Sequence, residues 1–176
     1  MKIYIVGSVA SGKTTFAKKL SERTGIECTH LDGIVHIKDE TNKVWGNIRR
    51  DDAEIIRLFN DVISNSKWII EDAGRTMFIK AMEEADLIIH LNPSSFTRKI
   101  RIFTRFIKQN LGLEDCLYTP NLRMIKFMYK AAKKYDKGND DLTLRLANYS
   151  DKIITLKTNR AVKKYLVLAK NRLPHN

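Results

Sequence analysis

The chain has 176 residues, a length typical of one domain, and its 32 Lys and Arg residues against 20 Asp and Glu leave a formal net charge of +12. A hydrophobic share of 43% with 30% charged residues is typical of a globular protein and excludes disorder as the main state. No apolar run approaches the roughly 18 residues of a membrane span, and the N-terminal run lacks the apolar core of a signal peptide. Two widely separated cysteines, Cys28 and Cys116, disfavour a disulfide, and we expect a cytoplasmic protein.

The basic excess is unevenly distributed along the chain. Residues 1–97 hold 13 Lys and Arg against 14 Asp and Glu, whereas residues 98–138 hold 11 against 3 and residues 139–176 hold 8 against 3. Most of the surplus therefore lies in one block, which indicates a local anion site rather than a uniformly polyanion-binding surface.

Short apolar runs with polar or glycine edges predict five buried strands. In chain order they are residues 3–6, 28–31, 68–70, 87–89 and 153–156, of which the second is the weakest. Because these runs lack polar alternation, they fit strands buried on both faces, as in a parallel sheet. Apolar residues at helical spacing after Asp51 and Asp52 predict a helix. The sequence therefore predicts one α/β domain over residues 1–176, a three-layer sandwich around a mainly parallel five-stranded sheet.

A glycine-rich motif follows the first predicted strand. Residues 7–14 read Gly-Ser-Val-Ala-Ser-Gly-Lys-Thr, which matches the phosphate-loop (P-loop) pattern G-x-x-x-x-G-K-[ST] in full. In such a loop, backbone N–H groups and a helix N-terminus bind phosphates, the lysine reaches the β- and γ-phosphates, and the hydroxyl ligates Mg²⁺. We therefore expect ATP and Mg²⁺ as ligands, with Thr14 on the metal. The predicted nucleotide-binding residues are Gly7, Ser8, Ala10, Ser11, Gly12, Lys13, Thr14 and Thr15.

Several classes of nucleotide-binding protein share this loop. A GTPase needs an Asn-Lys-x-Asp segment, but the one Asn-Lys pair, Asn42-Lys43, continues as Val-Trp. Further helicase or transporter motifs are not found in the sequence. A small-molecule kinase is the class that remains favoured.

The third predicted strand ends in acidic residues, in the sequence Trp-Ile-Ile-Glu-Asp-Ala-Gly-Arg-Thr of residues 68–76. An acid at the carboxyl end of such a strand faces Mg²⁺ and its waters, so Glu71 is predicted to hold the metal through water. Arg75 is predicted to bind a phosphate or carboxylate of the acceptor, and the alternative is a surface arginine beside a capped strand end. The segment resembles the adenylate-kinase stretch "LLDGFPRT", with Glu71 in its acidic position and Arg75-Thr76 matching its Arg-Thr.

Asp32 follows the second predicted strand. In shikimate- and adenylate-kinase-like enzymes, an Asp at this place contacts the acceptor or a metal-bound water. The resemblance implies that Asp32 is a general base or an aid to the metal, whereas an Asp-Gly turn is the equally weighted alternative. Residues 33–66 are the predicted acceptor-binding insertion, in which Arg49 and Arg50 either hold a negative group or begin a helix in solvent.

The basic block begins with a helical pattern. Arg98, Arg101, Arg105 and Lys108 share one face, with Ile100, Phe103 and Ile107 on the other side and no acids between them. This arrangement resembles the lid of a P-loop kinase, whose arginines close over ATP and balance the charge of the transferred phosphoryl group. We expect a lid at residues 94–138 in which Arg101 and Arg105 are catalytic. A later run, Lys126, Lys130, Lys133, Lys134 and Lys137, is either a solvated face or a polyanion surface.

Ordered segments over nearly the whole chain resemble one family. They are residues 2–8, 31–32, 48–50, 68–71, 85–89, 108–112 and the last predicted strand. They resemble the adenylate-kinase-related, FlaR-like proteins labelled "DNA topology modulation protein". The resemblance implies an adenylate- or shikimate-kinase-like fold with a helical lid.

The favoured hypothesis is a kinase that transfers the γ-phosphoryl group of ATP to a small anionic or hydroxyl acceptor. Its predicted catalytic residues are Lys13, Asp32, Arg75, Arg101 and Arg105. The family label implies an alternative, an ATP-dependent DNA-binding regulator of DNA topology. It is less favoured because the sequence has no recognisable helix-turn-helix, zinc site or basic tail.

Overall fold

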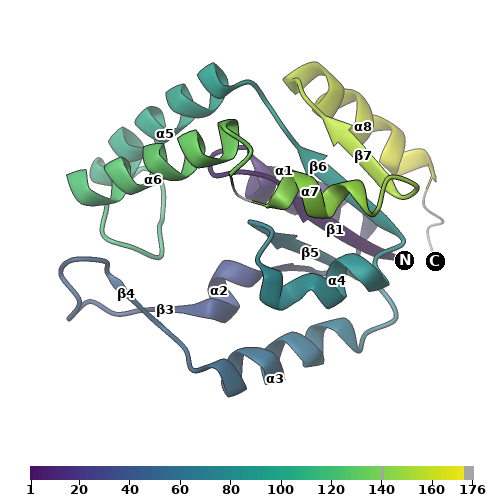
Figure 1. Cartoon of the computed structure of the whole chain (residues 1–176), viewed down its shortest axis with the longest axis horizontal. Coiled ribbons are helices and arrows are strands. Elements are labelled where there is room, and N and C mark those ends of the chain that lie inside the picture. Colours follow the sequence, from purple (N-terminus) through teal and green to yellow (C-terminus); the bar gives the residue numbers. More distant parts are fainter. Residues whose placement is uncertain (140, 173–176) are drawn as a thin grey trace.

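Five parallel strands form the central layer of the protein (Figure 1). The computed structural model describes residues 1–139 and 141–172. The strands lie in the order β2-β5-β1-β6-β7, which confirms the mainly parallel five-stranded sheet predicted from the sequence. Their bounds are β1 (Lys2–Val6), β2 (Cys28–His30), β5 (Trp68–Asp72), β6 (Leu87–Leu91) and β7 (Ile153–Leu156).

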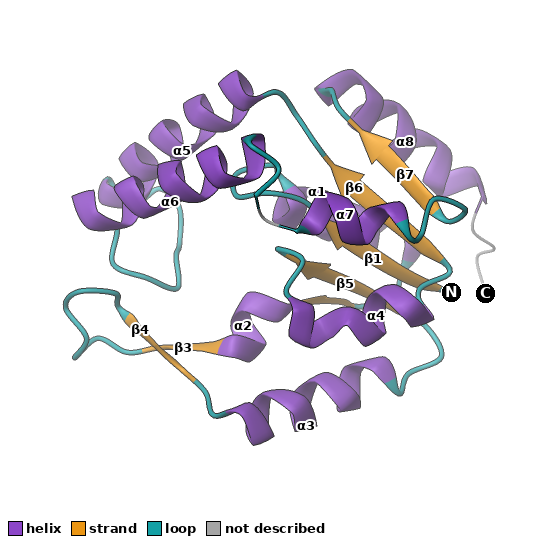
Figure 2. Ribbon diagram, viewed as in Figure 1, coloured by secondary structure: helices purple, strands orange, loops and turns teal. Residues whose placement is uncertain are grey.

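Helices cover both faces of this sheet (Figure 2). The helices on one face are α1 (Lys13–Thr24) and α8 (Asn159–Arg172). Those on the other are α3 (Asp52–Ile63), the 3₁₀ helix η1 (Thr76–Phe78), α4 (Ile79–Glu84) and α7 (Leu142–Ala147). Along β1, Ile3 and Ile5 pack on the face that α1 and α8 cover, while Tyr4 and Val6 pack on the face that α3, α4 and α7 cover. Both faces of the strand are buried, which explains why its sequence shows no polar alternation.

The insertion predicted at residues 33–66 contains elements that the sequence patterns did not indicate. Asp32 lies in the short helix α2 (Leu31–Val35) rather than in a simple Asp-Gly turn, and an antiparallel hairpin of β3 (His36–Lys38) and β4 (Asn47–Arg49) follows. The helix predicted after the acidic pair is confirmed as α3. Its N-cap is Asp51, whose side chain accepts a hydrogen bond of 2.8 Å from the Glu54 N–H. The boundaries of a separate insertion stay a prediction.

Helices α5 (Ser95–Asn110) and α6 (Leu122–Asp136) lie side by side beyond the carboxyl edge of the sheet (Figure 1). The predicted amphipathic helix is α5, but its orientation is unusual. An amphipathic helix ordinarily buries its apolar stripe, whereas here Arg98 and Ile102 are buried and Ile100, Phe103 and Ile107 are exposed. The arginine side of α5 therefore faces the rest of the protein.

Within the described ranges, no helix is both long enough and apolar enough to cross a membrane.

Candidate functional site

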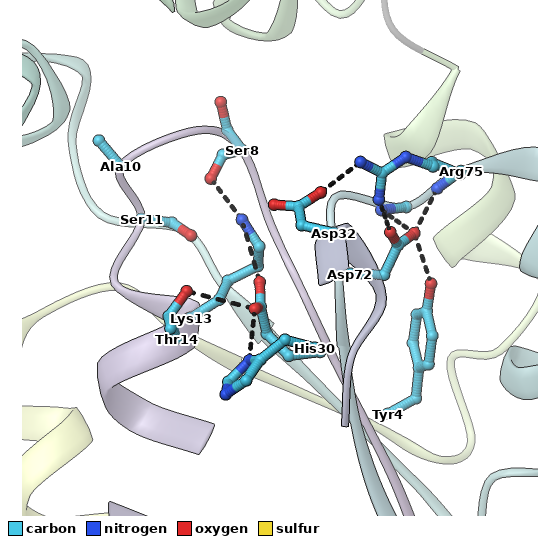
Figure 3. Close-up of polar contacts among 12 residues, drawn as sticks. Tyr4, Ser8, Ala10, Ser11, Lys13, Thr14, His30, Asp32, Asp72 and Arg75 are labelled. Carbon is cyan, nitrogen blue, oxygen red and sulfur yellow. Dashed lines mark hydrogen bonds and ion pairs between the residues drawn. The ribbon is translucent and has the colours of Figure 1, made fainter. Parts of the chain in front are cut away.

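The phosphate loop joins β1 to α1 at the carboxyl edge of the sheet (Figure 3). A Cβ at Gly7 would lie 2.3 Å from the carbonyl oxygen of Leu91 in β6, so only glycine fits where the loop leaves the sheet. Gly12, with φ of 96°, is the N-cap of α1, and no side chain in the described residues caps that helix. The N–H groups of its first turn are therefore available to an anion.

The lysine and the first threonine of the motif lie close to the acid at the end of β5. Lys13 Nζ is 3.0 Å from the carbonyl oxygen of Ser8 and 3.7 Å from Glu71 Oε1. The Thr14 hydroxyl donates to Glu71 Oε2 at 3.2 Å, while Thr15 is an exposed residue of the same helical turn. Two oxygen donors that suit Mg²⁺, a hydroxyl and a carboxylate, thus lie together beside the loop lysine.

Glu71 is kept ionised despite its burial. Burial works to raise its pKa, but the hydrogen bond from His30 and the positive charge of Lys13 outweigh that effect, so the pKa lies below the ordinary value of 4.5. His30 Nδ1 lies 3.0 Å from Glu71 Oε2, because β2 and β5 are parallel neighbours that pair His30 with Glu71. The carboxylate is therefore charged at neutral pH and oriented from two sides.

Two further carboxylates hold Arg75 (Figure 3). One guanidinium nitrogen of Arg75 donates to Asp32 and another donates to Asp72. Asp72 is fully buried and accepts hydrogen bonds from the Tyr4 hydroxyl at 3.0 Å and from the Gly74 N–H at 2.7 Å. Burial raises the pKa of Tyr4 well above 10.0, and the Asp72 charge adds to that shift, so Tyr4 stays a hydrogen-bond donor.

Arg101 reaches the phosphate loop from α5. Its Nη1 donates to the carbonyl oxygen of Ser11 at 2.7 Å and lies 3.4 Å from that of Ala10, while Nη2 donates to Asn159 Oδ1 at 2.7 Å. A Cβ at Gly12 would lie 3.1 Å from Arg101 Nη1, so the second glycine of the motif leaves room for this approach. The guanidinium therefore lies where loop, α5 and the start of α8 meet.

The other two arginines of the stripe have different surroundings. Arg98 is buried, pairs with Asp136 and stacks over the Tyr135 ring at 4.9 Å, so it joins α5 to α6 rather than facing the loop. Arg105 Nε lies 2.8 Å from Glu114 Oε1, one helical turn beyond Arg101. Of the predicted lid arginines, Arg101 is thus the one in contact with the loop, and the catalytic assignments of Arg101 and Arg105 stay predictions.

The β3–β4 hairpin touches α6 and the connection between α5 and α6. Trp45 packs edge-on against Phe127 with ring centroids 6.0 Å apart. The Thr119 N–H donates to the carbonyl oxygen of Trp45 at 2.9 Å, and the Asn47 amide donates to that of Leu117 at 2.8 Å. The predicted acceptor insertion and the predicted lid are therefore in direct contact at their tips.

Solved structures of low sequence identity share this architecture. A sugar kinase from a Janibacter species has 14% identity and a TM-score of 0.54, with 99% of this chain and 98% of that chain covered. A gluconokinase from Sinorhizobium meliloti has 14% identity and a TM-score of 0.54, with 97% and 94% covered. An uncharacterized protein from Eubacterium ventriosum has 17% identity and a TM-score of 0.50, with 98% and 100% covered. The chain has a P-loop kinase-like fold.

No protein-family model and no curated protein matches the chain. At 14 to 17% identity, the likeness to solved structures supports the fold and leaves the acceptor unidentified. The FlaR-like resemblance is therefore not confirmed.

Four residues of this candidate site were not assigned from the sequence: Tyr4, His30, Asp72 and Asn159. A sequence signal exists for two of them. His30 ends the strand beside β5, and Asp72 directly follows the predicted metal acid, so parallel neighbours ending at one edge would have brought both to the site. Tyr4 lies inside a buried strand and Asn159 meets Arg101 only through the tertiary fold, so neither carries a local signal.

Proposed function

We propose that the chain is an ATP-dependent phosphotransferase that acts on a small molecule. The observation that carries this proposal is the convergence of Lys13, Glu71 and Arg101 on one phosphate loop. A cytoplasmic location belongs to the proposal, and the free state of both cysteines supports it.

The phosphates of ATP would bind to the backbone of residues 7–14 and to the first turn of α1. Lys13 and Arg101 would stabilise the negative charge on the γ-phosphoryl group as it moves, because both cations adjoin the loop. Asp32 would accept the proton of the acceptor hydroxyl, since its side chain is exposed beside the loop lysine (Figure 3). Arg105 and residues 94–138 complete the proposed lid.

Thr14 and Glu71 fit the magnesium ion that such a reaction uses. Their oxygens lie 3.2 Å apart and Glu71 is ionised, which suits a hard divalent cation. Thr14 would bind the ion directly and Glu71 would hold it through water. Bound there with ATP, Mg²⁺ supplies charge neutralisation at the phosphates.

The direct test is ADP release by purified protein with Mg²⁺–ATP and a panel of nucleosides, nucleotides, sugars and hydroxy acids. We expect release that depends on one acceptor class and a loss of at least about 100-fold in Lys13→Ala. Lys18→Ala is the matched control, because it removes the same side chain from an exposed site on the same helix. No acceptor-dependent release across the panel, with ATP bound, would contradict the proposal.

The alternative, a DNA-binding regulator, is supported by the lysine run predicted from the sequence. Lys126, Lys130, Lys133, Lys134 and Lys137 are all exposed on or just after α6. They form no ion pair with any other residue that the structure describes. This alternative gives no role to Asp32 and Arg75, so the kinase is favoured. A salt series on duplex DNA binding separates the two, because phosphate contacts require a steep loss of affinity with added salt.

A further inference from the structure

The positive charge of Arg75 is already neutralised. Its guanidinium is shared between Asp32 on one side and Asp72 on the other. Each terminal nitrogen of the guanidinium already donates to one of these carboxylates, so a phosphate or carboxylate that binds both terminal nitrogens competes with them. An anionic acceptor would therefore have to displace a carboxylate before Arg75 could hold it through both terminal nitrogens.

The ion pair between Arg75 and Asp72 is held in place by further hydrogen bonds to Asp72. Asp72 Oδ1 accepts from the Arg75 side chain, while Oδ2 accepts from the Tyr4 hydroxyl and from the backbone N–H groups of Gly74 at 2.7 Å and Arg75 at 2.5 Å. All of these partners belong to β1 or to the turn after β5. Separating Arg75 from a carboxylate held so fully would leave a buried charge without its cation, which is strongly unfavourable.

The arginines of residues 33–66 also have partners, of which those of Arg49 and Arg57 are exposed carboxylates. Arg49 pairs with Asp52 at 2.5 Å, and Arg57 pairs with Asp61 at 3.4 Å. Arg50 donates to the carbonyl oxygens of Gly33 and Ile34 at 2.6 and 2.8 Å and pairs with Glu54 at 3.1 Å. The lysines of this segment, Lys38 and Lys43, are exposed on the β3–β4 hairpin. In this part of the described chain, each arginine has a carboxylate partner, so none presents an unpaired charge to an acceptor phosphate.

The charges around Asp32 offer an anion no excess of positive charge. The cations near this group are Lys13, Arg75 and Arg145, and the carboxylates are Asp32, Glu71 and Asp72. The set has no net charge, since Lys13 pairs with Glu71 at 3.7 Å and Arg145 donates to the carbonyl oxygen of Gly74 at 2.6 Å. Burial lowers the pKa of His36, so this neighbour is neutral near pH 7.

Asp32 nevertheless has one oxygen to offer. Its Oδ1 accepts from Arg75, whereas its Oδ2 accepts no hydrogen bond from residues 1–139 or 141–172. The side chain is 61% exposed, on the side of the loop lysine (Figure 3). A carboxylate oxygen with a fixed partner on its other side is suited to accept a hydrogen bond from a hydroxyl.

We propose that the acceptor is an uncharged, hydroxyl-bearing molecule, a nucleoside or a sugar, whose reacting hydroxyl binds Asp32 Oδ2, and that acceptors already phosphorylated are rejected. This inference rests on the proposed phosphotransferase function. The acceptor oxygen forms a bond to the γ-phosphorus while the bond from that phosphorus to the β,γ-bridging oxygen breaks. ADP leaves with the electron pair, and the hydroxyl proton passes to Asp32. Arg75 is a positioning residue that fixes the direction of Asp32.

Matched acceptor pairs test the class: adenosine against adenosine 5′-monophosphate, and glucose against glucose 6-phosphate, with ADP release as the readout. We expect kcat/KM at least about tenfold higher for the uncharged member of whichever pair is active, which is about 1.4 kcal/mol. The active pair distinguishes a nucleoside from a sugar. Preference for the phosphorylated member overturns this inference and leaves the phosphotransferase intact. Silence of both pairs and of the wider panel overturns the proposed function and this inference with it.

Asp32→Asn supplies a second readout that does not need turnover. This variant removes one of the two negative charges on Arg75. Binding of adenosine 5′-monophosphate to protein saturated with a non-hydrolysable ATP analogue should therefore tighten about tenfold. Turnover of the uncharged acceptor should fall at least about 100-fold, because the base is lost. Asp61→Asn, which removes the same charge from the exposed pair on α3, should change neither. Arg75→Lys should lower kcat more than it raises KM, because Lys restores the charge without the fork that orients Asp32. Unchanged binding and turnover in Asp32→Asn overturn the inference.

Discussion

The guanidinium of Arg101 donates a 2.7 Å hydrogen bond to the carbonyl oxygen of Ser11, so α5 contacts the phosphate loop through a side chain 90 residues away in the sequence. If this cation stabilises the transferred phosphoryl group, Arg101→Ala should lower kcat by about 10²–10³-fold, as removal of one charge-stabilising donor usually does. The kcat of Arg101→Lys should lie between those of the wild type and Arg101→Ala, because lysine keeps the positive charge but lacks the paired N–H donors of the guanidinium. Steady-state kinetics with saturating ATP and acceptor measure the effect.

Two controls on the same helix sharpen this prediction. Lys108→Ala removes an exposed cation and should leave kcat within about twofold. Arg105→Ala should cost less than Arg101→Ala, since Arg105 is paired with Glu114 a turn farther along. A larger loss of kcat in Arg105→Ala than in Arg101→Ala would show that Arg105, and not Arg101, stabilises the charge.

The central sheet and the phosphate loop could be predicted because their signals are local. An unbroken apolar run such as residues 3–6 identifies a strand buried on both faces, and Gly7 and Gly12 meet geometric needs that no other residue satisfies. The same holds for α3, whose N-cap Asp51 stands directly before its apolar pattern. In each of these cases the residues that decide the structure are neighbours in the sequence.

The parts that escaped prediction depend on distant partners. The spacing of Arg98, Arg101 and Arg105 indicates which residues share a side of α5, but not which side faces inward. That orientation is decided by Asp136, which pairs with Arg98 from α6. The contact of Trp45 with Phe127 joins residues that are 82 positions apart, and no periodicity reports it.

The inverted orientation of α5 predicts that substitutions at two adjacent apolar residues change the stability of the fold by very different amounts. Ile102 is 0% exposed, so Ile102→Ala should destabilise the fold by about 2–5 kcal/mol. Phe103 is 53% exposed, so Phe103→Ser should stay within about 0.5 kcal/mol of the wild type although it deletes the larger side chain. Urea unfolding of the two variants measures this contrast. Equal destabilisation would mean that the apolar side of α5 is covered in the free protein.

The assignment of Glu71 to magnesium predicts a metal-dependent defect. Removal of Mg²⁺ with EDTA should abolish turnover, and added MgCl₂ should restore it. In Glu71→Gln the half-saturating Mg²⁺ concentration should rise by about 10–100-fold, because outer-shell ligands typically contribute that much to metal affinity. Glu83→Gln, an exposed change on α4, serves as the control. If Glu71→Gln lowered kcat without altering the Mg²⁺ dependence, Glu71 would act on something other than the metal.

His90 predicts how stability depends on pH. Burial, with the charges of Arg98 and Lys157, lowers the pKa of this histidine from 6.5 to about 4, and its Nε2 lies 2.7 Å from the Tyr135 hydroxyl. Below pH 6.5 the unfolded chain therefore binds a proton that the folded chain takes up only near pH 4. The contribution of His90 is fully present above pH 6.5 and is lost as the pH falls toward 4, by about 2 kcal/mol between pH 7 and pH 5.

The measurement is urea unfolding of wild type and His90→Gln at pH 7 and pH 5, in which the variant should lose about 2 kcal/mol less than the wild type. Comparing the two proteins cancels the titration of the other ionisable groups. An NMR titration of the wild-type imidazole, expected to give a pKa of about 4, tests the same point without a variant. An imidazole that titrates near 6.5 in the folded protein would show that His90 is not held neutral at the end of β6, and the pH effect would then have another source.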